Sequence, residues 1–566
     1  MSVGASTGGL YAMSDAPFLS TLKSAQRYSV PPGVGRGCRS LCLAILMALL
    51  YGCAGRPPGA DFPRQASVAL AHPEQTRLGA QFAAAATDHG DASGFHILNA
   101  GVDGFLIRVE MIDAAQSSLD LQYFIFRGDA TGSFITAALL RAADRGVRIR
   151  LLIDDGDTVA GDEQILALAG KPSVEIRIFN PFRYRGHLRL VRGTEFLFNM
   201  RRLDYRMHNK LLVADNAVAL IGGRNIGNQY FQMDPYSQFA DDDVFSVGPI
   251  ARQLSATFDE FWNSPLSIPA AALGGVRHDR GTLAVDRPTA SSGTLLQGLE
   301  SPGVDYVAML RTGEPYVGLV SGLTPLIWAN AQVVADSPEK KDIVSGTRRG
   351  RLMAREVERV AAQVQTEMLI VTPYFVPARD EMSLLEGLLR QGARVALLTN
   401  SLSSAPSIIA QAGYANYRVP MLDAGADLYE VRPLLGRLRG SGQTARISRF
   451  GNFGLHAKFF VFDRQRLFLG SMNFDRRSRF LNTEIGLIID CPALAEEMAR
   501  RFEEMTRPEN VYAVSLRDRV HGVRGGMAWS TVESGRPVEY EKEPARSGWQ
   551  RMWMKLLELP PVGGEL

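Results

Sequence analysis

The sequence predicts an α/β protein built from two tandem halves of the same fold. Two long segments alternate expected strands with expected helices, and each contains one copy of the pattern H-x-K-x-x-x-x-D. The first copy begins at His208 and the second at His456, an offset of 456 − 208 = 248 residues. Strands that alternate with helices form a mostly buried sheet covered on both faces. We therefore expect an internal duplication with an α/β fold and a mostly buried sheet in each half.

The expected elements recur in the same order in both segments. Apolar periodicity and turn residues place them as follows. The first half contains a helix at 104–112, a strand at 118–126, a helix at 132–144 and a strand at 147–154; the second contains a strand at 367–375, a helix at 382–391 and a strand at 394–399, closed by a helix at 492–505.

Composition excludes several classes of protein. The 566 residues are 46% hydrophobic and 8% aromatic, a globular composition long enough for two or more domains. The net charge of +3 argues against bulk nucleic-acid binding as the main task. A mean hydropathy of −0.04 excludes a polytopic membrane protein.

The N-terminus is interpreted as a lipoprotein-type signal segment covering residues 1–52. Arg36 and Arg39 precede ten apolar residues, which suit a signal sequence and are too few to span a bilayer. Leu50-x-Gly52-Cys53 resembles a bacterial lipobox, so Cys53 is expected to carry the lipid. An uncleaved signal anchor is the alternative. Residues 53–87 are interpreted as a tether, and no disulfide framework is expected.

The two motifs place a histidine and a lysine on one face of a strand. Side chains alternate along a strand, so His456 and Lys458 share a face while Asp463 lies on the other. The motif aspartate then cannot join the other two on one ligand. His208, Lys210 and Asp215 repeat this arrangement in the first copy.

A tight hairpin after each motif predicts which residue faces the histidine. With Arg464-Gln465 as a two-residue turn, paired residue numbers sum to 463 + 466 = 929, which places Asn473 across from His456. The same reasoning places Asn225 across from His208. Each half would thus present one imidazole, one ammonium and one carboxamide.

This set of groups suits a phosphodiester. Lysine supplies positive charge, the amide donates hydrogen bonds, and histidine acts as nucleophile or acid. A metal site is not expected, because the lysine repels a cation and no carboxylate shares the histidine face within the motif. One copy alone could be a solvated strand edge, but two copies with matching followers argue against that interpretation.

These residues resemble the duplicated HKD motif of the phospholipase D superfamily. Further segments resemble the C subgroup of bacterial cardiolipin synthases, from about Leu98 to the C-terminus. They are Asn180-Pro181-Phe182, Met207-His208-Asn209-Lys210, Ile221 to Gly227, Pro325 to Ala329, Leu398 to Leu402 and Asn482-Thr483-Glu484. One departure is Gly223 in the first copy where the second has Ser471, so a hydroxyl contact to phosphate is expected only on the second side.

The resemblance implies two αβα sandwich halves related by a pseudo-twofold axis, with the active site at their interface. It also implies a catalytic mechanism without a cofactor. One histidine attacks phosphorus and forms a phosphohistidine, and the other protonates the leaving group. By resemblance His208 is the nucleophile and His456 the acid, although the nearly symmetric sequence does not decide between them. In the superfamily an acid from the next strand orients each histidine. Glu484 matches on the second side, and Asp243 is the better match on the first, with Asp241 as the alternative.

Three functions follow from the motifs and the resemblance. The first is phosphatidyl transfer to phosphatidylglycerol, which makes cardiolipin, with phosphatidylglycerol or phosphatidylethanolamine as donor. The second is hydrolysis by a phospholipase D or, less favoured, a nuclease. The third, a non-catalytic membrane-binding protein, is disfavoured by complete motifs in both halves. Phospholipids and a membrane surface are the expected partners, nucleic acid is not, and the envelope, facing the periplasm, is the expected location.

The expected domain boundaries place the first half at 88–275, the second at 276–512 and a C-terminal tail at 513–566. Basic stretches at 182–206 and 436–451 are interpreted as flanks of the cleft that attract anionic head groups. In the tail, apolar residues recur at helical spacing from Trp549 to Leu557. We expect this helix to lie on a membrane; docking on the second half is the alternative.

Overall fold

The computed structural model describes residues 56–156, 168–184, 189–234, 237–273, 300–301, 304–305, 317–433, 452–517 and 526–557. These residues belong to one of the two units into which the chain divides, Arg56–Leu566. The expected signal segment with Cys53, and the basic stretch at 436–451, lie outside the described residues. Within the described ranges, no helix is long and apolar enough to cross a membrane.

The first half contains an eight-stranded mixed sheet. Its strands lie in the order β9–β4–β3–β2–β5–β6–β8–β1, with β2, β3 and β4 parallel and the other pairs antiparallel. The bounds are β1 Ser93–Leu98, β2 Ser118–Tyr123, β3 Arg148–Asp154, β4 Val174–Phe179, β5 Leu211–Ala214, β6 Val218–Gly222, β8 Asp243–Val247 and β9 Ser267–Pro269.

The second half repeats this order and adds two strands. Its sheet runs β12–β21–β19–β18–β13–β15–β16–β22–β23–β24, with β13, β15 and β16 parallel. The bounds are β12 Ile327–Ala335, β13 Glu367–Val371, β15 Arg394–Asn400, β16 Asp427–Val431, β18 Phe459–Phe462, β19 Arg466–Gly470, β21 Ile485–Asp490, β22 Val511–Leu516, β23 Met527–Glu533 and β24 Arg536–Tyr540.

The two sheets join edge to edge into one 18-stranded sheet. Strand β1 pairs antiparallel with β12, its counterpart in the other half, with Ser93 opposite Ala329 and Phe95 opposite Ile327. Two equivalent edge strands that pair antiparallel are related by an approximate twofold rotation. The predicted duplication and pseudo-twofold arrangement are therefore confirmed.

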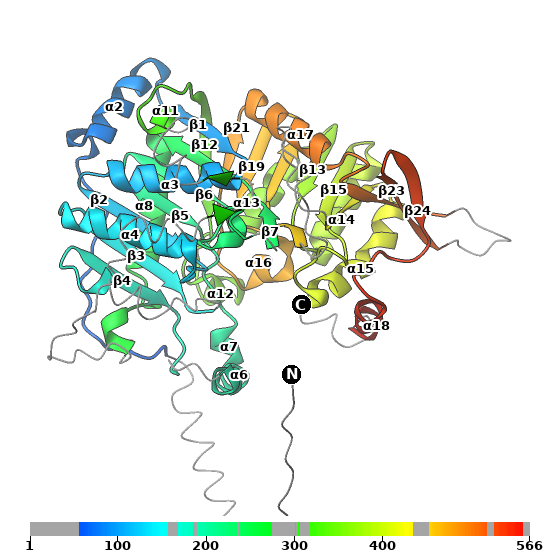
Figure 1. Ribbon diagram of the computed structural model, residues 1–566, viewed down its shortest axis with the longest axis horizontal. Helices are drawn as coiled ribbons and strands as arrows, with labels where there is room; N and C mark the ends of the chain where they lie inside the picture. The colour runs from blue at the N-terminus through cyan, green and yellow to red at the C-terminus, as the bar shows by residue number, and fades with distance from the viewer. Residues whose placement is uncertain are drawn as a thin grey trace, which may run out of the picture. The chain divides into compact units, whose positions relative to one another are not determined.

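Helices cover both faces of the sheet and form three layers (Figure 1). Helices α3 (Gly101–Ala114) and α4 (Ala130–Asp144) pack on one face of the first half, and α13 (Met353–Ala361) and α14 (Arg379–Arg390) on one face of the second. On the other face, residues of α8 (Pro249–Trp262) and α17 (Pro492–Met505) belong to one apolar core that includes strands of both halves. The predicted αβα sandwich is thus confirmed, and the halves share a core.

Eight further helices complete the described part of the fold. They are α2 Arg77–Ala86, α6 Arg189–Phe198, α7 Met200–Leu203, α11 Val317–Val320, α12 Lys340–Val344, α15 Ile408–Asp423, α16 Arg476–Phe480 and α18 Gly548–Leu557, with 3-10 turns η1 Pro73–Gln75, η2 Thr87–His89, η3 Asn228–Tyr230 and η4 Ala270–Leu273. Short strand pairs are β7 Ser237–Ala240 with β17 Asn452–Leu455, β14 Phe375–Val376 with β20 Phe474–Asp475, and β10 Glu300–Ser301 with β11 Val304–Asp305.

The expected tether at 53–87 is wrong for most of its length. Leu78 and Phe82 of α2 are buried in the core of the first half. Earlier in the segment, the carbonyl groups of Gln65 and Ser67 accept hydrogen bonds from Arg177 and Arg150. The low density of apolar residues concealed this packing, because the segment is held largely through its backbone.

The expected tail at 513–566 is also wrong in its first part. The boundary at 512 falls inside β22, which pairs with β16, and β23 and β24 extend the sheet further. The boundary at 275 likewise needs correction, because Leu319 and Val320 of α11 lie in the core of the first half.

Helix α18 forms where the spacing of apolar residues predicted it. Met554 is buried against α15, and Leu557 packs beside it. Trp549, Trp553 and Leu556 instead project into solvent, with exposed fractions of 70%, 53% and 54%. The helix therefore docks on the second half through one side and leaves the predicted apolar stripe on its outer side.

Candidate active site

The histidines precede strands β5 and β18, and the asparagines follow strands β6 and β19. The predicted hairpin register is wrong by one residue in both halves. Ala214 pairs with Val218 and Phe462 with Arg466, so the paired numbers sum to 432 and 928. The loops are one residue longer than expected because the motif aspartates and the residues after them take positive φ angles, 53° and 52° at Asp215 and Asn216.

One cavity of about 750 Å³ nevertheless brings the two motifs together. His208 and Asn225 line it from the first half, and His456 and Asn473 from the second. In each half the histidine lies just before one strand of the hairpin and the asparagine just after the other. The two residues are therefore not directly opposed partners within the hairpin, as the sequence analysis predicted them to be. Further lining residues include Phe124, Arg127, Arg206, Tyr230, Phe239, Tyr374, Ser407, Ile409, Asp475, Arg477, Asn482 and Arg546.

Each histidine binds a carboxylate from the opposite half. The Nδ1 atom of His208 lies 2.8 Å from Oε2 of Glu484. The Nδ1 atom of His456 lies 2.5 Å from Oδ2 of Asp241. Backbone hydrogen bonds align these crossed pairs: the amide of His208 donates to the carbonyl of Thr483, and the amide of His456 to that of Ala240. Both carboxylates therefore hold Nδ1 and leave Nε2 for the cavity.

The prediction that Asp243 orients a histidine is wrong. The Asp243 carboxylate lies in β8 and accepts hydrogen bonds from two buried arginines, Arg108 at 2.8 Å and Arg224 at 3.0 Å. The alternative, Asp241, reaches His456 because β7 pairs with β17 of the other half and carries the following residues across the interface. Glu484 does contact a motif histidine, but that of the first half and not that of the second, where it was expected. Pairing within one half was the wrong assumption.

The prediction that Ser471 presents its hydroxyl to a phosphate in the cavity is wrong. It is fully buried, donates a hydrogen bond to Oε2 of Glu484 at 2.5 Å and accepts one from the amide of Ile485. Its counterpart Gly223 lies against the carboxylate of Asp241, where a side-chain carbon would collide with that group. Gly223 therefore leaves room for the carboxylate of Asp241, whereas Ser471 binds that of Glu484 through its hydroxyl.

Two lysines lie beneath the histidines. Lys210 and Lys458 are both buried, and each Nζ donates to the backbone carbonyl of its motif histidine. Burial lowers the pKa of Lys458 to about 8, against the opposing effect of Asp241 and Glu484, and lowers that of Lys210 well below its usual value. An anion in the cavity would favour the charged form of both lysines.

Burial also sets the charge of the histidine pairs. It lowers the pKa of His208 and His456 well below 6.5, and the positive charges of both lysines act in the same direction. Burial raises the pKa of Asp241 to about 6 and of Glu484 to about 7. Both histidines are therefore neutral at neutral pH when no anion is bound, because both pKa values shift in the same direction.

The motif aspartates support the strands. Asp215 accepts hydrogen bonds from the amides of Gln116, Ser117 and Ser118, just before β2. Asp463 does the same before β13, accepting from the amides of residues 365–367. Both face away from the cavity, as strand alternation predicted, and each fixes the entry of a central strand beside its motif.

The asparagines leave polar atoms available in the cavity. Oδ1 of Asn225 accepts from the amide of Ile125, while its buried Nδ2 makes no hydrogen bond to the described residues. Oδ1 of Asn473 is likewise buried without a partner in the described part of the chain. Since a carboxamide can rotate by 180°, either group can present NH2 to an anion.

A buried pair behind Glu484 was missed by the sequence analysis. Oδ2 of Asp336 accepts from the amide of Glu484 at 2.9 Å and from Nζ of Lys340 at 2.7 Å. The same Nζ also donates to the carbonyls of Ser478 and Asn482, so it holds the loop that carries Glu484. A Lys at i+4 from an Asp is common on helices, so the sequence contained no specific signal for this role.

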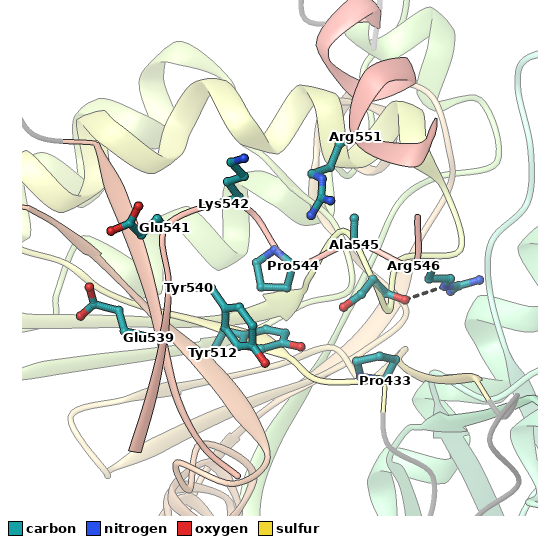
Figure 2. Close-up of a pocket in the computed structure, with 11 residues that line it drawn as sticks. Pro433, Tyr512, Glu539, Tyr540, Glu541, Lys542, Pro544, Ala545, Arg546 and Arg551 are labelled. Carbon is teal, nitrogen blue, oxygen red and sulfur yellow. Dashed lines mark hydrogen bonds between the residues drawn. The ribbon is translucent and has the colours of Figure 1, made fainter. Parts of the chain in front are cut away.

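Arginines from both halves add positive charge to the cavity. Arg206 is held by Asp154, and Arg477 binds Asp204 of the opposite half. Arg546 lies on the segment before α18 and donates to the carbonyl of Ser403. It also borders a second cavity of about 550 Å³, where Lys542, Arg551 and Tyr540 lie around the turn that leads to α18 (Figure 2). Tail residues were not expected near the site.

The arrangement can perform acid–base and nucleophilic chemistry on an anionic group. Two neutral imidazoles present Nε2 to one cavity, each held at Nδ1 by a carboxylate. Two carboxamides line the same cavity, two buried lysines lie beneath the histidines, and apolar rings line the walls, with Phe239 stacked on His456 at 5.3 Å between ring centres. These groups can bind a tetrahedral anion, attack it and exchange a proton with a leaving group.

Comparison with known proteins gives consistent matches. The family described as "Cardiolipin synthase, PLD-like domain" matches residues 109–262 and 359–506. Cardiolipin synthase C of Escherichia coli K12 is 34% identical over 487 residues, which cover 84% of this chain and 97% of that protein. The major cardiolipin synthase of Bacillus subtilis 168 is 23% identical over 413 residues, 72% of this chain and 68% of that one. A phosphatidylserine synthase structure from Haemophilus influenzae Rd KW20 aligns with a TM-score of 0.49 at 13% identity, covering 74% and 87% of the two chains.

Proposed function

The chain belongs to the cardiolipin synthase family with phospholipase D-like domains, and on this basis we propose that it is a phosphatidyltransferase that makes cardiolipin. The observation that carries the proposal is the cavity in which both motif histidines meet, each fixed by a carboxylate of the other half. A phosphodiester between the two imidazoles would contact a group from each half. The two halves would then form one active site.

In the first step His208 attacks the phosphorus of a phospholipid. The lone pair on Nε2 forms the N–P bond while the bond from phosphorus to the head-group oxygen breaks. His456, protonated once the anionic substrate is bound, gives its Nε2 proton to the departing alkoxide. The products of this step are a phosphatidyl-histidine and a free head-group alcohol. The choice of His208 as nucleophile follows the family resemblance.

In the second step a hydroxyl group of phosphatidylglycerol accepts the phosphatidyl group. Neutral His456 removes the proton from this hydroxyl, its oxygen attacks phosphorus, and the N–P bond breaks. Cardiolipin is released, and His456 is protonated for the next cycle. When the donor is phosphatidylglycerol the alcohol released is glycerol; when it is phosphatidylethanolamine the alcohol is ethanolamine.

The lysines and asparagines stabilise the phosphate. Lys210 and Lys458 supply charge beside the histidines, and Asn225 and Asn473 supply NH2 groups to the nonbridging oxygens. Negative charge on these oxygens rises as the bonds exchange, so the groups contribute most in the transition state. In this role the two lysines and the two asparagines would bind one phosphate from both sides.

The enzyme would act at a membrane, where its substrates reside. The expected lipid on Cys53 would hold it to the bacterial envelope on the periplasmic side. Helix α18 would add contact, because its two exposed tryptophans and Lys555 suit the head-group layer of an anionic membrane. Water would compete with phosphatidylglycerol as acceptor, so hydrolysis is the alternative reaction of the same site.

Purified protein incubated with phosphatidylglycerol, with and without phosphatidylethanolamine, tests the proposal. We expect cardiolipin together with glycerol, and ethanolamine in addition if phosphatidylethanolamine serves as donor. Lipid products are separated by chromatography and the released alcohols are quantified. Phosphatidic acid alone would show that water is the acceptor and would overturn the synthase assignment.

A further inference from the structure

Helix α6 exposes its apolar side to solvent, whereas a helix that packs on a core buries that side. Leu190 and Leu197 are 81% and 66% exposed, and Phe198 is 65% exposed. Leu190 and Leu197 lie seven residues apart, as do Val191 and Phe198, so both pairs project from one side of the helix. Met200, at the start of α7, is exposed beside them. The apolar side of α6 therefore faces away from the protein.

The polar side of α6 is the one attached to the protein. Glu195 accepts hydrogen bonds from the amides of Arg183 and Tyr184 and pairs with Arg202. Arg192 donates to the carbonyl of Asp155 and packs over the ring of Phe182. These contacts fix the orientation of the helix, so its apolar side cannot turn inward without breaking them. Part of the basic stretch predicted to attract head groups thus holds α6 in place.

The end of α7 leads directly into the active-site cavity. Asp204, which follows α7, binds Arg477, and Arg206 lines the cavity two residues later. On the other side of the cavity, Ile409 of α15 lines it and is itself 45% exposed, and Arg546 leads into α18. A helix with exposed apolar residues therefore adjoins the cavity lining in each half: α6 precedes Arg206 in the first half, and α18 follows Arg546 in the second. Both lie along the lower edge of Figure 1.

We propose that the apolar side of α6 inserts into the head-group region of an anionic bilayer and forms a second membrane contact beside α18. This proposal rests on the proposed function, since it brings the cavity to the lipids that the reaction needs. Glu195 is the single acidic residue of α6 and is engaged inside the protein, whereas Arg183, next to Glu195, and Arg201 of α7 are exposed. Exposed apolar residues flanked by cations are typical of helices that bind anionic lipid surfaces.

The inferred contact differs from a general attraction to membranes because it involves two separate helices. With α6 and α18 both inserted, the cavity between them would face the bilayer, and a phospholipid head group could enter without the acyl chains leaving the membrane. Contact through α18 alone would hold one side of the cavity. We therefore expect α6 to contribute to binding even when α18 is intact.

The test uses the full-length chain with Cys53→Ser, so that no acyl anchor contributes, and vesicles of phosphatidylglycerol and phosphatidylcholine. The variant Leu190→Glu/Leu197→Glu should bind vesicles about tenfold or more weakly. Leu323→Glu is the matched control, because Leu323 is 79% exposed and comes three residues after α11 in the chain. Figure 1 shows α11 in the upper part of the molecule, away from α6 and α18. This control should bind like the parent. Leu197→Trp should bind more tightly, and it decides the question if the double variant fails to fold.

The outcomes separate this proposal from the proposed function. Short-chain phosphatidylglycerol dissolved as monomers should be converted equally by the parent and the α6 variants, because the cavity is unchanged. If the parent makes no cardiolipin from any substrate, the proposed function fails while the vesicle comparison still stands. Equal vesicle binding by all variants would overturn the membrane contact. The proposal would also be overturned if the α6 variants kept vesicle binding but lost a dimer that the parent forms in light scattering. That result would assign the α6 surface to a second copy of the chain.

Discussion

The Nδ1 atom of His208 lies 2.8 Å from Oε2 of Glu484, although the two residues are 276 positions apart in the chain. The mirror relationship joins His456 to Asp241, 215 positions earlier. Each half thus provides an imidazole for its own motif and a carboxylate for the other. Neither half alone contains an oriented histidine, so the duplication has produced one interdependent site.

Replacing Glu484 tests the crossed arrangement. In Glu484→Gln, His208 loses the carboxylate that holds Nδ1, so we expect kcat to fall by roughly 10²–10⁴-fold with little change in KM. Asp243→Asn is the control, because Asp243 binds Arg108 and Arg224 and, among the described residues, neither of the motif histidines. It should lower thermal stability and keep kcat of the folded fraction within about tenfold. The opposite ranking of the two variants in kcat would restore the assignment of Asp243.

The pH dependence of stability tests the state of the same pair. Burial lowers the pKa of His208 below 6.5, so the unfolded chain takes up a proton first and stability falls as the pH falls. Burial raises the pKa of Glu484 from 4.5 to about 7, so this group contributes stability at low pH that is lost as the pH rises through 7. The two contributions oppose each other between the unfolded-state values of 4.5 and 6.5.

Glu484→Gln removes one of these opposing contributions. As the pH falls from 6.5 to 5, the parent gains stability from the protonation of Glu484 and the variant does not. We therefore expect the free energy of unfolding of the variant, relative to that of the parent, to decrease by up to about 1.4 kcal/mol for each pH unit of this fall. Denaturant unfolding at several pH values measures this difference in slope. The same slope in both proteins would show that Glu484 does not hold a proton in the folded state.

The pH dependence of the rate should report the buried lysines. Because burial lowers the pKa of Lys458 to about 8 and that of Lys210 in the same direction, the free enzyme loses positive charge above this pH. We expect kcat/KM for cardiolipin formation to decline above about pH 8. Lys458→Arg keeps its charge, so any activity it retains should decline less in this range. A constant kcat/KM up to pH 10 in the parent would contradict the role of the lysine charges.

Adjacent residues of α18 should separate membrane binding from packing. Trp553 is 53% exposed and Met554 is 1% exposed. Trp553→Ala should weaken vesicle binding and leave the thermal midpoint nearly unchanged. Met554→Ala should cost about 2–5 kcal/mol of stability and leave vesicle binding of the folded protein unchanged. If Trp553→Ala lowered stability instead, the outer stripe would be part of a core and the membrane role of α18 would be dropped.

The sequence predicted the architecture well because it repeats. The two motifs and the periodic segments placed the strands and helices around them, and α17 matches the expected 492–505 at both ends. Local patterns also separated the cavity residue His456 from the supporting residue Asp463. What they could not provide was the pairing of β7 with β17, which carries Asp241 across the interface.

The remaining errors concern features that local patterns do not specify. Gly223 leaves room for the carboxylate of Asp241, whereas Ser471 binds that of Glu484. Strands β23 and β24 were missed because they pair at a sheet edge, where a strong apolar pattern is not required. One sequence contains little information about either feature.

The central claim is that both halves form one catalytic site. Cardiolipin formation from phosphatidylglycerol by His208→Ala, His456→Ala and the double variant tests it most directly, with folding checked by thermal unfolding. We expect each single variant to lose at least about 10³-fold in rate and the double variant to lose no more than the singles, because residues that act as a unit are not additive. If either single variant kept near-normal activity while folded, the two histidines would not share a site and the account would be wrong.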